Sequence, residues 1–460
     1  MSFVRTETRR LVTLATPVVI TQVSMMLMGV VDVIMVGHVG TDALDGASLG
    51  RLWVFGTLLF GLGMVMGIDP IVAQAHGSRD SHRLSLALQQ GLVIAALASI
   101  PVALMWLFTE ESLLLLQQNP VHAHLAEQFA LVQIPSIPVF YVYSVLRQYL
   151  QGRGIVRPAM WMALMANVVN LVLNWVFIYG HWGAPALGVM GSGLATACTR
   201  LFMLVTLLGF MVMWRLHEGA WHGWTRSALK FEGLREVLHY GMPVGIHMGL
   251  EVWAFDLATL FAGKLGAVAL GAHTLALNLA SLAFMVPLGV SMAAVTRVGN
   301  LIGEGKPREA QTSAWISMVL GAGFMGVTAV LMIAFRGLIP KMYTHDVAVI
   351  AAGAAILPIA AAFQVFDGIQ VVGMGILRAM GRTRPAAVFN FIGYYVLALP
   401  CAWWLAFSLH LGLAGVWWGL ALGIAAVAVA LVVWVWRRGP ARVDARILRK
   451  AVLSAPLEGP

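Results

Sequence analysis

The chain has 460 residues, of which 60% are hydrophobic and 11% are charged, with a formal net charge of +9 and a mean hydropathy of +0.84. A soluble globular protein is about a quarter charged and about half apolar. This composition therefore excludes a soluble enzyme, a disulfide-rich secreted domain and a disordered chain. We expect an all-α integral membrane protein, because the length and apolar content allow about a dozen helices of about 20 residues each.

Stretches without charge locate the expected helices. Residues 265–296 and 310–335 contain no charged side chain, and the longer runs 158–199 and 385–436 are also free of charge and can each hold two helices. Because a helix of about 20 apolar residues spans the hydrocarbon core, we predict twelve transmembrane helices, at 11–36, 48–73, 88–110, 125–150, 160–180, 190–214, 238–263, 273–298, 314–336, 351–377, 388–408 and 412–436.

Basic residues predict how the chain is oriented. Of the 29 Lys and Arg residues, 24 fall on the side that carries both termini and only four on the other side, namely Arg51, Lys264, Arg336 and Lys341. Loops rich in Lys and Arg face the cytoplasm. We therefore expect both termini to be cytoplasmic.

The two halves of the chain resemble one another. At a shift of 226 residues the matched pairs include Pro17 with Pro243, Gly63 with Gly289, and Gly77 with Gly303. At a shift of 227, residues 154–158 match 381–385. Six helices in each half give both halves the same orientation, as in transporters built from parallel repeats. Two such lobes can rock about a central cleft, which is an architecture for alternating access.

The repeat divides the chain into four segments. These are an N-lobe (1–215), a cytoplasmic linker (216–237), a C-lobe (238–437) and a cytoplasmic tail (438–460). The sequence contains no phosphate-binding loop, HExxH or GxSxG motif. We therefore expect a transporter and not an enzyme, with an ion gradient and not ATP as its energy source.

Acidic residues inside the predicted helices are candidates for function. An ionised side chain at a helix centre costs about 2.5–3.5 kcal/mol to insert. Glu251 and Asp367 lie near the midpoints of their helices, in the same lobe. They could share a cation such as Na⁺ or carry protons. The alternative is that they are ion-paired packing residues, although no lysine or arginine other than Arg200 lies in the middle of a predicted helix.

Three other acids fall within predicted helices. Asp32 lies in the first, and Asp256 follows Glu251 by five residues, roughly 140° around the helix. Asp256 could therefore face either the central cleft or a neighbouring helix. Asp69 precedes Pro70 near a helix end, where we expect an interface role.

Asparagines form a stripe on the fifth predicted helix. Asn167, Asn170 and Asn174 are spaced i, i+3 and i+7, so they share one face. Amides in lipid hydrogen-bond to neighbouring helices. The stripe is either a helix–helix contact or a polar wall of the N-lobe near Asp32.

Five motifs are specific in combination. They are VDVIMVGHVG at 31–40, QAHG at 74–77, GIVRP at 154–158, the run from Pro287 to Gly299, and QVFDGIQ at 364–370. Together they resemble the multidrug and toxic compound extrusion (MATE) family, most closely its bacterial NorM-like branch, and the resemblance covers all twelve predicted helices.

The resemblance implies an antiporter with a V-shaped pair of six-helix lobes, which exports cationic amphipathic drugs in exchange for Na⁺ or H⁺ and needs no other cofactor. It implies that Glu251 and Asp367 are the cation-site acids of the C-lobe and the candidate Na⁺ ligands. It also implies that Asp32 is the N-lobe acid, linked to protonation and to bending of a first helix that carries Pro17.

The same resemblance places Asn170 and Asn174 among the polar groups near the N-lobe acid. Two departures concern the C-lobe. Phe363 stands where NorM-like members often have tyrosine, so a phenol oxygen near Asp367 is missing, although a cation–π contact is possible. Asp256 is an acid that the branch usually lacks, and it could compensate. Phe363 and Gln364 are expected in the substrate cleft, and the coupling ion stays open between Na⁺ and H⁺.

We expect a multi-pass, monomeric multidrug efflux antiporter in a bacterial cytoplasmic (inner) membrane. Its expected partners are small organic cations and the lipid bilayer, without nucleic acid. One alternative is a flippase for a lipid-linked precursor, from the same superfamily, which a cleft rich in basic residues would favour. Another is an integral-membrane transferase, which would need a cluster of acids or histidines at one membrane face, and the sequence does not reveal such a cluster.

Overall fold

The computed structural model describes residues 2–218 and 221–442, and the regular elements in this part of the chain are all helical. In the N-terminal half they are α1 (Ser2–Gly37), α2 (Thr41–Val65), α3 (Ile68–Gly77), α4 (Ser81–Leu107), α5 (Thr109–Leu115), α6 (Pro120–Leu131), α7 (Ser136–Gly152), α8 (Arg157–Tyr179) and α9 (Gly188–Met213).

The C-terminal half follows a short 3₁₀ turn, η1 (Arg226–Leu229). Its helices are α10 (Phe231–Lys264), α11 (Ala267–Gly303), α12 (Pro307–Ala334), α13 (Ile339–Tyr343), α14 (Val347–Ala379), α15 (Thr383–Phe391), α16 (Leu399–Trp403) and α17 (Gly412–Arg438), with π-helical segments η2 (Ile392–Ala398) and η3 (Trp404–Ser408) and the turn η4 (Pro440–Arg442). Most of the predicted tail, including Arg446, Arg449 and Lys450, lies outside the described residues.

The number of membrane-spanning helices agrees with the prediction. In the described ranges, 2–218 and 221–442, eleven helical segments are long and apolar enough to span a membrane, and the bent pair α6–α7, counted as one span, makes a twelfth. That pair differs from the single helix expected at 125–150, because it breaks between Leu131 and Ser136 with a bend of 57°. Pro135 lies in the break, and its nitrogen has no hydrogen to donate to a continuous helix.

Several helices extend beyond the predicted apolar segments. α10 begins at Phe231, so it starts inside the segment 216–237 that was expected to be a linker. Its first residues include Glu232, Arg235 and Glu236. Helix ends that protrude from the bilayer carry such charges, so hydropathy alone does not mark where they begin.

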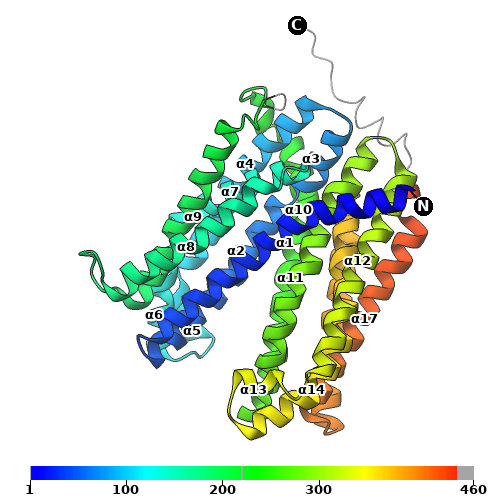
Figure 1. Ribbon diagram of the computed structural model, residues 1–460. Helices are drawn as coiled ribbons and strands as arrows, with labels where there is room; N and C mark the ends of the chain where they lie inside the picture. The colour runs from blue at the N-terminus through cyan, green and yellow to red at the C-terminus, as the bar shows by residue number, and fades with distance from the viewer. Residues whose placement is uncertain (1, 219–220, 443–460) are drawn as a thin grey trace.

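The helices form two bundles arranged as a V, as Figure 1 shows. We call α1–α9 the N-lobe and α10–α17 the C-lobe. The lobes meet at the end where the chain termini lie and diverge toward the end that carries α5, α6 and α13. We call the end where the lobes meet the basic end, because its loops are rich in arginine, and we call the opposite end the far end. Each lobe has its own apolar core, one in the N-lobe and two large clusters in the C-lobe.

Glycines of the internal repeat lie where the lobes touch. A Cβ atom on Gly63 would lie 2.1 Å from Cα of Gly245 in the other lobe, and one on Gly289 would lie 2.4 Å from the Val19 side chain. Gly245 and Val19 are themselves 226 residues apart, so the two contacts are equivalent. The repeated glycines therefore allow close approach of the two lobes. The same relation holds nearer the basic end for Gly77 against Asn300 and Gly303 against Gln74.

Candidate functional site

A cluster of polar side chains lies inside the C-lobe, around the two acids expected at mid-helix. Glu251 on α10 is half-buried, and Asp367 on α14 is 5% exposed. The Asn390 amide on α15 donates to Glu251 Oε2 at 3.3 Å, and the Gln370 amide donates to Asn390 Oδ1 at 2.8 Å. Tyr394 is fully buried and lies close enough to both carboxylates to interact with them electrostatically. Four helical segments therefore bring five polar groups together.

The oxygens of this cluster suit a small hard cation or a proton. Asp367 and Glu251 are close enough to repel each other when both are ionised. Among the described residues, Asp367 Oδ1 and Gln370 Oε1 are buried without a hydrogen-bond partner. Carboxylate, amide and phenol oxygens are ligands that hard cations accept. A positive charge at this point would offset the repulsion and satisfy the free oxygens.

Tyr394 alters the interpretation of Phe363. The resemblance to NorM-like proteins implies that a phenol oxygen is missing beside Asp367, because Phe363 stands where they often have tyrosine. The structure places the Tyr394 phenol near both acids. The Phe363 ring packs edge-on against Phe255 and Trp417, with ring centroids 6.0 Å and 5.6 Å apart. The C-lobe cluster therefore has a phenol, supplied by a different helical segment.

Gln364 and Asp256 lie outside this hydrogen-bonded group. Gln364 shares a face of α14 with Asp367, is fully buried, and accepts a bond from Thr328 at 3.4 Å. Asp256 is half-buried, and in the described part of the chain it forms no hydrogen bond or ion pair with the cluster. The structure thus brings Glu251 and Asp367 together without Asp256.

A second polar cluster lies in the N-lobe around Asp32 of α1, which is 7% exposed. Asn174 of α8 donates to Asp32 Oδ1 at 2.6 Å and to Asn170 Oδ1 at 3.1 Å. Thr196 of α9 donates to Asp32 Oδ2 at 3.5 Å. Asn167, from the same stripe, instead donates to the Ser24 carbonyl of α1 at 3.0 Å. Two members of the stripe therefore form the polar wall, and the third is a helix–helix contact.

Arg51 lies beside the N-lobe acid, although the distribution of basic residues suggested only that it faces the side away from the termini. It is on α2, and with Asp32 and Ser192 it lines a small cavity. Its guanidinium donates to the Gly29 carbonyl of α1 and interacts with Asp32 at longer range. A side chain on Gly29 would collide with the guanidinium. Gly29 therefore makes room for a half-buried arginine next to Asp32.

Glu251 and Asp367 have no ion-pair partner in the chain as far as the structure describes it, and Asp32 interacts with Arg51 only at longer range. Within residues 2–218 and 221–442, no lysine or arginine forms an ion pair with Glu251, Asp367 or Asp32. This differs from Asp69 of α3, which is buried and pairs with Arg378 of α14 at 3.4 Å. Asp69 joins the two lobes near the basic end, as its position beside Pro70 suggests. The unpaired acids remain available for a mobile cation or proton.

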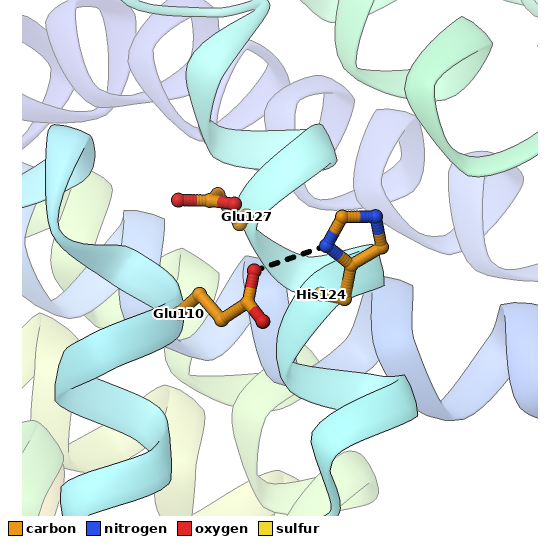
Figure 2. A group of neighbouring side chains, drawn as sticks. All are labelled: Glu110, His124 and Glu127. Carbon is orange, nitrogen blue, oxygen red and sulfur yellow. Dashed lines mark hydrogen bonds and ion pairs between the residues drawn. The ribbon is translucent and has the colours of Figure 1, made fainter.

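A further group at the far end was not found from the sequence. Glu110 of α5 and His124 and Glu127 of α6 bring their carboxylate and imidazole atoms within 4.8 Å of one another (Figure 2). The Glu110 carboxylate contacts His124 Nδ1 at 3.0 Å, and this imidazole holds the pKa of Glu110 below its ordinary value. His124 is exposed to solvent. The ion pair between α5 and α6 accounts for this arrangement.

Sequence reasoning missed several members of the buried clusters. Gln370 is one turn after Asp367 on the same helix face, and Asn390 is an amide within a charge-free run. Both features are visible in the sequence and could have marked them. Tyr394 and Arg51 carried no such signal, because their positions depend on how separate helices pack.

The fold and its buried acids define a membrane transporter built from two related lobes. The family model MatE matches the chain twice, over residues 17–176 and 243–404. The matches begin at Pro17 and Pro243, which confirms the internal repeat. The chain belongs to the MatE family, and it is a NorM-like MATE transporter and not an enzyme.

Relatives and solved structures agree with this membership. The chain is 35% identical over 429 residues to the multidrug resistance protein NorM of Burkholderia vietnamiensis, covering 92% of each chain. It is 33% identical over 458 residues to multidrug and toxin extrusion protein 2 of Mus musculus, covering 99% of this chain and 78% of the other. The fold matches the eukaryotic MATE transporter AtDTX14 with a TM-score of 0.89 at 24% identity, covering 98% and 100% of the two chains.

Proposed function

We propose that this protein exports cationic amphipathic compounds in exchange for Na⁺ or H⁺. The observation that carries the proposal is the pair Glu251 and Asp367, two carboxylates in the C-lobe interior without a lysine or arginine ion-pair partner in the described chain. An ionised acid inside the membrane costs free energy unless a bound cation offsets its charge. The names of the relatives, which include multidrug resistance and toxin extrusion proteins, support the same substrate class.

Exchange follows from competition for negative charge. A cation or proton at Glu251 and Asp367 offsets the charge that a cationic drug would otherwise offset. Ion and drug therefore favour opposite states of the lobes, and their affinities are coupled. Asp32 is the candidate ion-coupling acid of the N-lobe, and Asp256 is a further candidate because it lies on the same helix as Glu251.

The remaining predicted residues are assigned supporting roles in this proposal. Asn170 and Asn174 orient Asp32 through their hydrogen bonds. Phe363 and Gln364 precede Asp367 by one helical turn on α14, and we assign them to the part of the drug cleft that adjoins this acid. Pro17 interrupts the backbone hydrogen bonding of α1 and allows it to bend.

The decisive experiment is transport by the purified protein in liposomes. A Na⁺ or H⁺ gradient is imposed, one at a time, and a fluorescent organic cation is followed. Asp367→Asn is expected to abolish exchange, whereas Asp45→Asn, at an exposed acid on α2, leaves it unchanged. Undiminished exchange in Asp367→Asn, with the protein folded, would reject the role of the acid pair.

We further propose that the protein is a monomer of the bacterial inner membrane with its basic end in the cytoplasm. The asymmetry of Lys and Arg supports this orientation. Cys198 and Cys401 are the two native cysteines, so both are first replaced by serine. In intact cells, Ala186→Cys at the far end should react with an impermeant maleimide, and His82→Cys should not. The opposite labelling pattern contradicts the orientation.

A further inference from the structure

The first helix of each lobe begins on the opposite lobe. Ala15 of α1 is buried in a C-lobe core, whereas Met28 and Val36 of the same helix belong to the N-lobe core. Figure 1 shows α1 running from the C-lobe side at the basic end across to the N-lobe. We call residues 2–16 of α1 the α1 arm. Since α1 is one helix from Ser2 to Gly37, whatever fixes its arm to the C-lobe also ties the lobes together.

α10 crosses in the reverse direction. Val237 is buried in the N-lobe core, whereas Ala254 and Ala258 lie in a C-lobe core. We call residues 231–242 the α10 arm. Pro17 and Pro243, the prolines matched by the repeat, follow directly after the two arms. The two crossings are therefore related by the pseudo-symmetry of the lobes.

The α1 arm is fixed by a buried ion pair. Glu7 has no solvent exposure, and its two oxygens accept hydrogen bonds from Arg297 Nε and an Arg297 terminal nitrogen at 2.7 Å and 2.9 Å. Arg297 is on α11 of the C-lobe, and its side chain is 12% exposed. Glu304 lies 4.0 Å from the same guanidinium, and Arg10 lies 4.0 Å from Glu7. Bidentate arginine–carboxylate pairs are among the stronger polar contacts in proteins.

The α10 arm is held by a weaker pair. Arg83 of α4 contacts Glu236 through a single distance of 3.0 Å, and the side chains are 30% and 40% exposed. Exposed ion pairs contribute little to stability because water and salt screen them. The two arms thus follow equivalent paths but are attached differently. The exposed pair Arg83–Glu236 therefore serves as a matched control for the buried pair Glu7–Arg297.

We propose that Glu7 and Arg297 form a latch that holds the basic end closed, and that this latch sets the balance between the two states of the transport cycle. The inference rests on the proposed function, because alternating access requires the lobes to separate at the basic end. In the described structure they meet there and diverge at the far end. Opening the basic end must either break this bidentate pair or move the α1 arm away from the N-lobe. Glu7 and Arg297 are positioning residues, since neither belongs to the buried acid clusters.

The test measures the separation of the lobes directly. Spin labels are attached at His82→Cys and Arg308→Cys at the basic end, and in a second sample at Ala186→Cys and Leu411→Cys at the far end, in the Cys198→Ser and Cys401→Ser background. Distances are recorded in lipid nanodiscs without drug. Glu7→Gln is expected to raise the population with a separated basic end by about tenfold, the size of effect expected for a lost charge-assisted hydrogen bond. The far-end distance should shorten in the same proportion of molecules.

Controls separate the latch from general damage. Arg297→Lys keeps the charge but not the bidentate contact, and its distances should fall between those of the wild type and those of Glu7→Gln. Glu236→Gln should change the distances little. Unchanged distances in Glu7→Gln, or an equal change in Glu236→Gln, would overturn the latch. If Glu7→Gln fails to fold, the distances of Arg297→Lys decide: wild-type values reject the proposal.

The latch and the proposed function can fail separately. If wild-type protein in liposomes does not exchange an organic cation for Na⁺ or H⁺, the proposed function is wrong, whatever the distances show. If the wild-type protein does exchange but the spin-label distances of Glu7→Gln equal those of the wild type, the latch is wrong and the proposed function stands. The latch is supported if Glu7→Gln shifts the spin-label distances and also alters the ratio of the maximum transport rate to the half-saturating drug concentration.

Discussion

Asn390 donates a hydrogen bond to the Glu251 carboxylate at 3.3 Å across 139 residues of sequence. The same Asn390 side chain accepts from Gln370 at 2.8 Å. Asn390 therefore connects the acid on α10 to α14, the helix that carries Asp367. An amide in this position can orient Glu251 without neutralising its charge, which leaves the carboxylate free to bind a cation or proton.

Replacing Asn390 should impair transport without unfolding the protein. Asn390→Ala removes the donor to Glu251, and a hydrogen bond to a charged group is worth about 1.5–3 kcal/mol. We expect the exchange rate at limiting ion concentration to fall about tenfold or more. The measurement is drug exchange in liposomes as a function of the ion gradient. Asn278→Ala, at an exposed asparagine of α11, is the control, and equal rates in both variants would contradict the role of Asn390.

Tyr394 should affect the coupling ion more than the drug. Tyr394→Phe removes one hydroxyl near both acids while keeping the ring that packs against Phe255. If the phenol contributes to the ion site, the half-saturating concentration of the coupling ion should rise several-fold, with a smaller change in maximum rate. Tyr395→Phe is a close control, because that hydroxyl donates to the Leu250 carbonyl at 3.0 Å. An unchanged ion dependence in Tyr394→Phe excludes the phenol from the site.

Drug exchange should depend more on Asn174, which donates a hydrogen bond to Asp32, than on Asn167 of the same helix. Asn174 gives Asp32 its shortest hydrogen bond, 2.6 Å, and both side chains are buried. Asn174→Ala leaves the carboxylate in the same apolar surroundings with one donor fewer, so we expect about a tenfold loss of exchange. Asn167→Ala removes a contact to the Ser24 carbonyl instead, and should retain most of the activity. The idea is wrong if the two variants transport equally well.

Close contact between the lobes should make the repeated glycines sensitive to a single methyl group. Gly63→Ala would place Cβ 2.1 Å from Gly245, so the lobes must shift. Overpacking typically costs about 1–3 kcal/mol, and we expect a lower melting temperature in detergent for Gly63→Ala and for its counterpart Gly289→Ala. Gly323→Ala, where no heavy atom lies within 4 Å of the added carbon, should not lower it. A melting temperature equal to wild type in both repeat variants would contradict the close approach.

The class of fold and much of its symmetry could be predicted from the order of the residues. Twelve apolar segments, the uneven distribution of arginine and lysine and the match of Pro17 to Pro243 are local or periodic features. They follow from the need of every membrane-spanning backbone to satisfy its own hydrogen bonds within helices. The same reasoning indicated Glu251 and Asp367, because an acid in a long apolar segment stands out against its neighbours.

Which side chains meet follows only from how the helices pack. Asn390, Tyr394 and Arg51 are ordinary residues in their own helices, and they become members of polar clusters through the packing of helices distant in the chain. The crossing of the α1 arm to Arg297 is likewise invisible in the sequence, since it depends on the path of a helix between two lobes. Side-chain periodicity gives the face of one helix, but the partner of that face is fixed only when all the helices pack together.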